Sequence, residues 1–345
     1  MRNKTYLLLS FVLVHWGCQE TPSILIDKNL KEVATFPIGL AVQANYLTNL
    51  RYSKTVLEEF NSLTAEREMK QNVLMPEPNT YNWIYADSII AFAERHQMRV
   101  HGHTLLWHSS IPYWLDLFQG TDAEFETLIK TYIQTVVSRY AGKITSWDVV
   151  NEAFEDEGGE LRNSLFQRRI GDDYVAKCFQ WAREADPDVL LFYNDYGLVW
   201  NKSKCEAVIK MLDDFENNNI PIDGIGLQMH ISDNYPRNSD IEKAVDLFVE
   251  RGLKIHFSEL DVRVNPNGTA TELTQKLAEQ QFRKVKAITE IYNTIPTAQK
   301  SGITLWGLRD NESWVLAHWG NLDWALFFDE KYERKLAHQG FLQAF

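Results

Sequence analysis

Alternation between apolar strand-like stretches and amphipathic helical stretches constrains the fold of this 345-residue chain more than any other feature. Eight short stretches are rich in aliphatic, β-branched and aromatic residues: 36–42, 62–66, 99–105, 146–152, 189–194, 222–230, 254–262 and 302–307. Helical periodicity fills the gaps at 85–96, 125–140, 174–185, 204–217, 241–251 and 271–294, and a last helix is expected at 333–344. Strands that alternate with helices predict a parallel sheet, and eight such units predict a single (β/α)8 TIM barrel. Because no interior linker or repeat interrupts the pattern, we expect one domain over 24–345.

Polar side chains gather at the carboxyl ends of these predicted strands. They are Glu66, His103, Asn151, Glu152, Asn194, Gln228, His230 and Glu259, with Trp306 on the last strand. In (β/α)8 barrels the active site is built at the carboxyl ends of the strands. Since scattered polar residues would not favour one end of so many strands, we expect these side chains to line one pocket.

Two glutamates have the positions that suit acid–base chemistry best. Glu152 closes the apolar stretch WDVVNE, and Glu259 lies near the end of KIHFSELDV. A pair of carboxyl groups, one protonated and one ionised, is what hydrolysis of a glycosidic bond requires. Taken alone, a glutamate at a strand end is more often a solvated charge. Because both glutamates belong to the predicted pocket, we predict glycoside hydrolysis, with Trp107, Trp306 and Trp314 as apolar walls that raise the pKa of the acid.

Charge and composition narrow the choice of partner. The formal net charge is −12 and no basic cluster occurs, so nucleic acid is not an expected partner. A neutral polysaccharide needs no electrostatic steering and is compatible with an acidic surface. The 11 Trp and 14 Tyr residues offer aromatic faces for sugars, although aromatic side chains also fill cores. We expect a monomer, and the sequence leaves open whether Cys178 and Cys205 are bonded.

Histidines on the third predicted strand leave a metal-dependent barrel hydrolase as an alternative. His101 and His103 have the His-x-His spacing of a zinc site, and His230 could complete it. Sugar sites also use histidine to bind hydroxyl groups, and a structural His101 is the commoner case. We therefore expect no metal and no cofactor, and a chelator separates the two interpretations. Strand alternation predicts that His256 points away from the pocket if Glu259 points into it.

The first residues have the pattern of an export signal. Basic residues precede an apolar run at 6–14, which is too short to span a bilayer. The following Gly-Cys pair resembles a bacterial lipoprotein cleavage site. We therefore expect residues 1–18 to be a signal peptide, with a lipid on Cys18 and a polar tether at 19–23. The protein would then be exported as an outer-membrane lipoprotein in the periplasm or at the cell surface, and ordinary secretion is the alternative.

Motifs along nearly the whole chain resemble those of glycoside hydrolase family 10, whose members are mostly endo-β-1,4-xylanases. The stretch WDVVNEA at 147–153 resembles the acid/base motif of the family, and FSELD at 257–261 resembles its nucleophile motif. Further similar motifs are HGHTLLWH at 101–108, EADP at 184–187, YNDY at 193–196, GLQMH at 226–230 and WGLRDNESW at 306–314. Each motif alone is moderately specific, whereas the complete set in this order is highly specific.

This resemblance implies a retaining enzyme that forms a covalent glycosyl-enzyme intermediate without a metal. Glu152 would be the acid/base and Glu259 the nucleophile, and Asn151 would bind the 2-hydroxyl of the −1 sugar. The other implied residues are Lys70, His103 and Trp107 at the −1 sugar, Gln228 beside Glu152, His230 beside Glu259, Tyr196 on the leaving-group side, and Trp306 and Trp314 as walls. Glu66 and Lys70, four residues apart, are assigned to sugar binding rather than to a solvated ion pair.

The sequence departs from the family pattern at positions that affect which substrate is bound. Family members usually have Asn after the Glu that matches Glu66 and Trp after the Lys that matches Lys70, whereas this chain has Arg67 and Gln71. Arg67 would block the −2 sugar or bind a carboxylate there, with Arg309 as a second cation near the site. We therefore expect cleavage of internal β-1,4-xylosidic bonds in xylan, with uronic-acid-decorated xylan as a candidate substrate. A catalytically weak polysaccharide-binding surface protein is the other alternative, although a mere binder does not need both glutamates.

Overall fold

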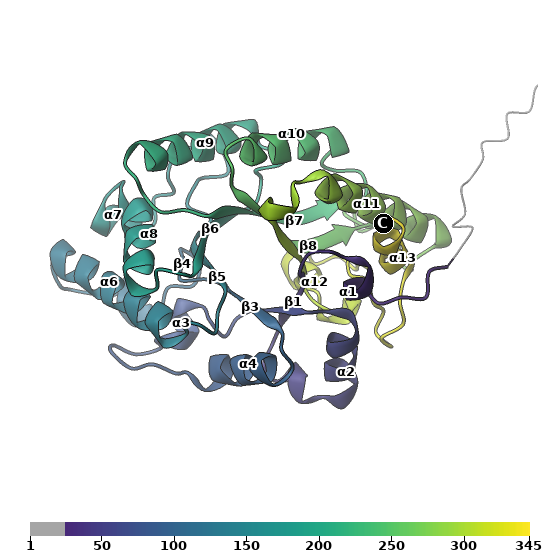
Figure 1. Cartoon of the computed structure of the whole chain (residues 1–345), viewed down its shortest axis with the longest axis horizontal. Coiled ribbons are helices and arrows are strands. Elements are labelled where there is room, and N and C mark those ends of the chain that lie inside the picture. The colour runs from purple at the N-terminus through teal and green to yellow at the C-terminus, as the bar shows by residue number, and fades with distance from the viewer. Residues whose placement is uncertain (1–24) are drawn as a thin grey trace, which may run out of the picture.

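The computed structural model describes residues 25–345, which form a ring of helices around a barrel of strands (Figure 1). The predicted signal peptide 1–18, with Cys18, and the tether 19–23 lie outside the described residues. Within the described part of the chain, no helix has the length and apolar character needed to cross a membrane.

The barrel consists of parallel strands in a closed order. The strands are β1 (Ile38–Val42), β2 (Ser62–Ala65), β3 (Arg99–Gly102), β4 (Leu106–Trp107), β5 (Ser146–Asn151), β6 (Leu190–Asp195), β7 (Gly224–Ser232), β8 (Lys254–Arg263) and β9 (Lys300–Leu305). They pair in the order β3-β2-β1-β9-β8-β7-β6-β5, and β3 also pairs with β5, which closes the barrel. The short β4 pairs with β5 beyond β3, so β3 and β4 together occupy one strand position of the barrel. The predicted (β/α)8 barrel is confirmed, with each predicted strand within two residues of an observed one except 99–105, which is interrupted.

Helices of very different length surround the barrel. They are α1 (Leu30–Val33), α2 (Leu50–Glu59), α3 (Gln71–Leu74), α4 (Ile84–Arg95), α5 (Tyr113–Asp116), α6 (Asp122–Arg139), α7 (Leu165–Ile170), α8 (Tyr174–Ala185), α9 (Lys202–Asn217), α10 (Asn238–Val249), α11 (Gln275–Thr294), α12 (Trp314–Trp319) and α13 (Leu336–Leu342). Short 3-10 turns lie at Tyr46–Thr48, Thr297–Gln299 and Asp310–Glu312. The long helices are amphipathic and bury one face, as α8 does with Phe179 and Ala182. Cys178 and Cys205 are free and buried in this layer.

Side chains from several strands fill the interior of the barrel. The rings of His101 and His256 lie 4.6 Å apart, and Phe192 packs edge-on against both. His256 Nε2 is also hydrogen-bonded to Thr304 Oγ1 at 2.8 Å. These buried groups fill the barrel, so it is a packed core rather than a channel.

The position of His256 corrects the prediction from strand alternation. His256 lies in the barrel interior, and Glu259, three residues later, also turns inward. The register between β8 and β9 shifts between Phe257 and Leu260, which changes the facing of the residues that follow. His256 is therefore an interior residue and does not point away from the pocket.

Candidate active site

Both candidate carboxylates occupy unusual backbone conformations. Glu152 directly follows β5 and has φ of 57°, and Glu259 lies in β8 with φ of 55°. For a residue other than glycine this left-handed conformation costs on the order of 1–2 kcal/mol. The register of β5 also shifts between Asp148 and Val150, shortly before Glu152. Such strain and register shifts occur preferentially at functional sites, where they re-aim a side chain.

One hydrogen-bond network joins the two carboxylates across neighbouring strands. The side-chain oxygen of Asn151 accepts hydrogen bonds from Asn194 Nδ2 at 2.8 Å and from Gln228 Nε2 at 3.2 Å. Asn194 also donates to Glu259 Oε1 at 2.7 Å, and Gln228 also donates to Glu152 Oε1 at 3.1 Å. The residues that the sequence placed at the ends of separate strands therefore form one site.

Two histidines lie beside the carboxylate of Glu259. His230 Nε2 lies 3.1 Å from Glu259 Oε2, and His103 Nδ1 lies 4.0 Å from Oε1. Burial by itself raises the pKa of Glu259, but the hydrogen bond from His230 and the nearby imidazole of His103 lower it to about 2. Burial lowers the pKa of His230, but Asp261, 2.7 Å from Nδ1, raises it to about 10 together with Glu259. An ionised carboxylate in a fixed orientation suits the role of nucleophile.

Glu152, in contrast, has neutral hydrogen-bond donors. Trp107 Nε1 donates to Glu152 Oε2 at 2.7 Å, and Gln228 donates to Oε1. Burial raises the pKa of Glu152, and the negative charge of Glu259 raises it further, against the lowering effect of these two hydrogen bonds. Lys70 Nζ lies 4.5 Å from the centre of the Trp107 ring. A carboxyl group that keeps its proton above its usual pH range suits the role of general acid.

The His-x-His pair near the end of β3 is tied to a buried aspartate. His103 Nδ1 lies 2.9 Å from Asp148 Oδ2, and His101 Nε2 lies 3.1 Å from the same oxygen. The other nitrogen of His101 is hydrogen-bonded to Ser146 Oγ at 2.7 Å. Among residues 25–345, no group of three or more His, Cys, Asp and Glu side chains is arranged to hold a metal ion. The metal-dependent alternative therefore gains no support from the placement of these histidines.

Two tryptophans line the site beside Glu259. Trp306 is buried and packs edge-on against His103, with ring centroids 5.2 Å apart. Trp314 packs against His230 at 4.7 Å and donates from Nε1 to Asp261 Oδ2 at 2.8 Å. Both indoles are therefore fixed by the histidines and the aspartate that also surround Glu259.

Tyr196 follows β6 directly and is half-buried. Lys204 Nζ lies 3.7 Å from the centre of its ring, over one face. The tyrosine hydroxyl donates to Asp156 and accepts from Arg162 Nη2 at 3.3 Å. The ring is thus held at both its face and its hydroxyl.

Comparison with known proteins gives the same assignment as the motifs. A family model described as Glycosyl hydrolase family 10 matches residues 27–344. The chain belongs to glycosyl hydrolase family 10. The resemblance found in its motifs is thereby confirmed, and the match covers nearly all of the described residues.

Relatives in family 10 align over most of this chain. Endo-beta-1,4-xylanase Xyn10C of Cellvibrio japonicus is 35% identical over 94% of this chain and 59% of that protein, so the chain spans less than two thirds of it. Endo-1,4-beta-xylanase B of Thermotoga neapolitana is 36% identical over 95% of this chain and 93% of that protein. Among solved structures, a Cellvibrio japonicus Xylanase10C variant in complex with xylopentaose has a TM-score of 0.89 at 35% identity, covering 92% of this chain and 69% of that one. Xylanase 10B from Thermotoga petrophila RKU-1 in complex with xylobiose has a TM-score of 0.87 at 33% identity, covering 93% and 98%.

The side of the family 10 site next to β2 carries cations beside a glutamate. Glu66 directly follows β2, accepts a hydrogen bond from Gln43 Nε2 at 2.9 Å and lies 3.5 Å from Arg67 Nε. The side chain of Arg67 is 68% exposed, so its guanidinium is open to solvent. Burial lowers the pKa of Lys70, while the nearby carboxylates act against this lowering. Of these two cations, Lys70 lies closer to Glu152 and Glu259, and Arg67 lies at the rim.

Arg309 is engaged by its own part of the chain. Its Nε donates to Glu312 Oε1 at 2.9 Å, and its Nη1 donates to the backbone carbonyl of Glu330 at 3.2 Å. The guanidinium also lies 4.2 Å from the centre of the Tyr332 ring. Arg309 is therefore oriented by the segments that follow β9.

Three residues to which the sequence assigned no role complete the site. Asn194 belongs to the polar strand-end group but received no role from the sequence. Asp148 and Asp261 support the histidines on either side of Glu259. Asp261 lies two residues after Glu259 in the motif FSELD, and this position is the sequence signal that points to it.

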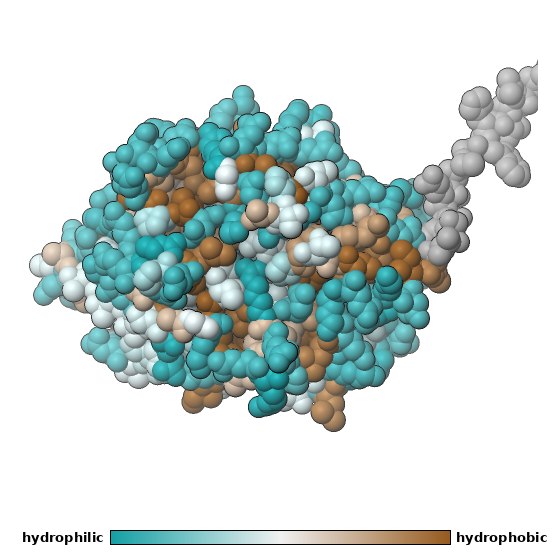
Figure 2. Space-filling model, in the orientation of Figure 1, coloured by the Kyte–Doolittle hydropathy of each residue, from teal (hydrophilic) through white to brown (hydrophobic). Residues whose placement is uncertain are grey.

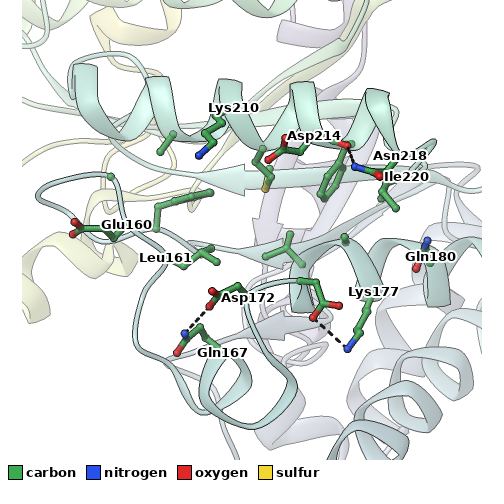
Figure 3. A pocket seen from close by; sticks show the side chains of 18 residues that line it. Glu160, Leu161, Gln167, Asp172, Lys177, Gln180, Lys210, Asp214, Asn218 and Ile220 are labelled. Atoms are coloured by element: carbon green, nitrogen blue, oxygen red, sulfur yellow. Dashed lines mark hydrogen bonds and ion pairs between the residues drawn. The ribbon is translucent and has the colours of Figure 1, made fainter.

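A separate groove of about 1150 Å³ lies on the outer wall of the barrel between α8 and α9 (Figure 3). Hydrophobic residues reach the surface in several patches among hydrophilic ones (Figure 2). The groove is lined by Lys177 and Gln180 from α8, Lys210 and Asp214 from α9, and Leu161 from the loop after β5. None of the residues in the carboxylate network lines it, so it is distinct from the candidate active site.

Proposed function

We propose that this family 10 protein is an endo-acting β-1,4-xylanase that cleaves internal xylosidic bonds with retention of configuration. The proposal is carried by the opposite pKa shifts of two carboxyl groups that belong to one hydrogen-bond network. The pKa of Glu259 is lowered to about 2 by its partners, whereas the pKa of Glu152 is raised by burial and by Glu259. Relatives support the choice of substrate, because they include endo-1,4-beta-xylanases and structures with xylopentaose and xylobiose.

The reaction proceeds in two displacements. Glu259 attacks the anomeric carbon of the −1 xylose as the bond to the glycosidic oxygen breaks, and Glu152 gives its proton to that oxygen. The shortened xylan chain leaves as an alcohol, and a glycosyl ester forms on Glu259. Glu152, now a carboxylate, then takes a proton from water, whose oxygen attacks the same carbon, and Glu259 leaves as a carboxylate. Two inversions give net retention.

The surrounding residues bind and select the −1 sugar. Asn151 binds its 2-hydroxyl, where interactions strengthen most in the transition state, and Lys70 and His103 bind its other hydroxyl groups. Trp306 and Trp314 form a wall on which the hydroxymethyl group of a glucose unit would clash. The site therefore favours xylose over glucose by exclusion.

An assay on linear β-1,4-xylan tests this function. Wild-type protein should release xylo-oligosaccharides of several lengths, and NMR of the first product should show the β-anomer. Glu259→Ala serves as the blank and should release no product above background. Release of xylose alone would contradict internal cleavage, and initial formation of the α-anomer would contradict retention.

We infer further that the rim next to β2 accepts a carboxylate carried by decorated xylan. The exposed guanidinium of Arg67 suits bidentate binding of a uronic acid. A hydrogen bond to a charged group is worth about 1.5–3 kcal/mol, so Arg67→Asn should lower kcat/KM on glucuronic-acid-decorated xylan by about tenfold or more. Plain xylan should be cleaved at least as fast as before. Arg95→Asn removes the same charge from an exposed position at the end of α4 and should change neither rate. Equal rates for wild type and Arg67→Asn on both polymers would refute this preference.

We also propose that residues 1–18 direct export and that Cys18 carries a lipid. Support comes from the basic start, the short apolar run and the following Gly-Cys pair. The full-length chain should partition into the detergent phase after expression in a bacterium that processes lipoproteins. Cys18→Ala should move it to the aqueous phase, and identical partitioning of the two proteins would overturn the lipid assignment.

A further inference from the structure

Lys204, in the first turn of α9, is fully buried although it carries a charge. Its Nζ lies 2.8 Å from Asp195 Oδ1 and 3.5 Å from Asp156 Oδ1. Asp195 is also fully buried, at the end of β6. Removing two charges from water costs about as much as their attraction restores, so a buried pair of this kind contributes little net stability. The contacts of this pair with the candidate active site indicate a role other than stabilising the fold.

From Asp195 the contacts lead to the acid/base. Tyr193 donates from its hydroxyl to Asp195 Oδ2 at 2.5 Å, and the same hydroxyl accepts from the backbone N–H of Ala153 at 3.0 Å. Ala153 directly follows Glu152, which has the strained φ of 57°. The ion pair of Lys204 and Asp195 therefore fixes the hydroxyl that holds the backbone next to the acid/base.

From Lys204 a second set of contacts leads to the leaving-group side. Its Nζ covers one face of the Tyr196 ring, and the Tyr196 hydroxyl is bonded to Asp156 and Arg162. Arg162 Nε also donates to the backbone carbonyl of Glu152 at 3.3 Å. The lysine thus lies between the backbone of the acid/base and the ring that would stack on the departing sugar.

We propose that Lys204, with Asp195 and Tyr193, is a positioning unit that aligns the proton of Glu152 with the oxygen of the departing sugar. This inference rests on the proposed glycosidase function and adds to it residues that act only through Glu152 and Tyr196. A misaligned acid slows the breaking of bonds whose leaving group needs a proton. Leaving groups that depart as stable anions should be insensitive to the misalignment.

The test compares two aryl β-xylobiosides that differ only in the leaving group. Phenyl β-xylobioside needs protonation, and 2,4-dinitrophenyl β-xylobioside does not. Lys204→Met should lower kcat/KM on the phenyl glycoside by about tenfold, a part of the 10²–10⁴-fold that general acid catalysis supplies. The loss on the dinitrophenyl glycoside should stay below about twofold. Because kcat/KM reports only the steps up to the first bond cleavage, the second displacement does not obscure the comparison.

Two further variants decide between positioning and a general structural role. Lys284→Met removes another buried lysine, which is bonded to Pro236 and Asn238, and it should affect both glycosides equally. Tyr193→Phe keeps the ring and removes only the hydroxyl, so it decides the question if Lys204→Met does not fold. It should show the same selective loss of kcat/KM on the phenyl glycoside. Equal losses on both glycosides, or no loss, in Tyr193→Phe would overturn the inference while the proposed function stands. Wild-type protein that cleaves neither glycoside would overturn the proposed function and the inference with it.

Discussion

Replacement of His230 tests the charge assignment of the site most directly. Glu259 has a pKa of about 2, against about 4.3 for a free glutamate, although burial acts to raise it. The hydrogen bond from His230 is the strongest contribution in the opposite direction. A hydrogen bond between charged groups is worth about 1.5–3 kcal/mol, and 1.36 kcal/mol corresponds to one pKa unit. His230→Ala should therefore raise the pKa of Glu259 by roughly one to two units, to about 3–4.

The direction of the effect on activity follows from the role of the nucleophile. In the proposed mechanism Glu259 acts as an anion, so activity is lost as the pH falls through its pKa, and the variant should lose activity at a higher pH than the wild type. Carbon-13 NMR of protein labelled at the glutamate side-chain carboxyl groups measures this pKa, with Glu259→Gln identifying the signal. His338→Ala removes another buried histidine, one that pairs with Glu59, and should leave the Glu259 signal unchanged. Titration of Glu259 at the same pH, within about half a unit, in His230→Ala and wild type would refute the charge assignment.

Four further substitutions separate acid catalysis, electrostatics and packing. Glu152→Ala should lower kcat/KM on xylan by about 10²–10⁴-fold. On 2,4-dinitrophenyl β-xylobioside, whose leaving group departs without a proton, azide, a nucleophile that needs no base, should restore turnover of this variant as glycosyl azide detected by mass spectrometry. Trp107→Phe removes a hydrogen bond that lowers the pKa of Glu152, so the alkaline limb of the kcat/KM profile should move to higher pH. Gly226→Ala would place a Cβ 2.1 Å from Asn194 Oδ1 and should therefore reduce kcat/KM strongly. Gly102→Ala would place a Cβ 2.2 Å from the buried indole of Trp147, and it should lower the free energy of unfolding in urea by about 1–3 kcal/mol with the site intact.

The architecture could be predicted from the sequence because each barrel strand is recognisable from its own short stretch of residues. Fully buried parallel strands read as apolar runs, and the run WDVVNE ends in polar residues where β5 ends. The break between β3 and β4, within the predicted strand 99–105, was not predictable in this way. The chain leaves the sheet after Gly102 and rejoins it at Leu106, although His103, Thr104 and Leu105 between them are buried like the residues of a strand.

The fine structure of the site could not be predicted, because it depends on long-range geometry. The shift of register after Phe257 turns both His256 and Glu259 inward, whereas simple alternation places them on opposite faces. The hydrogen bonds of Asn194 join residues more than forty positions apart. The local sequence likewise gives no indication that Arg309 is held by the carbonyl of a distant loop residue and by a tyrosine ring.

The different partners of the two carboxyl groups also account for the two roles of Glu152. Neutral donors hold Glu152 in place, so burial and the charge of Glu259 set its proton affinity. When Glu259 becomes an uncharged ester in the proposed intermediate, one of the two causes that raise the pKa of Glu152 disappears. Its pKa then falls, and the group that gave a proton in the first step is better able to remain ionised until it accepts one from water. Charged partners at Glu152 would weaken this change, because they would fix its protonation state regardless of the state of the nucleophile.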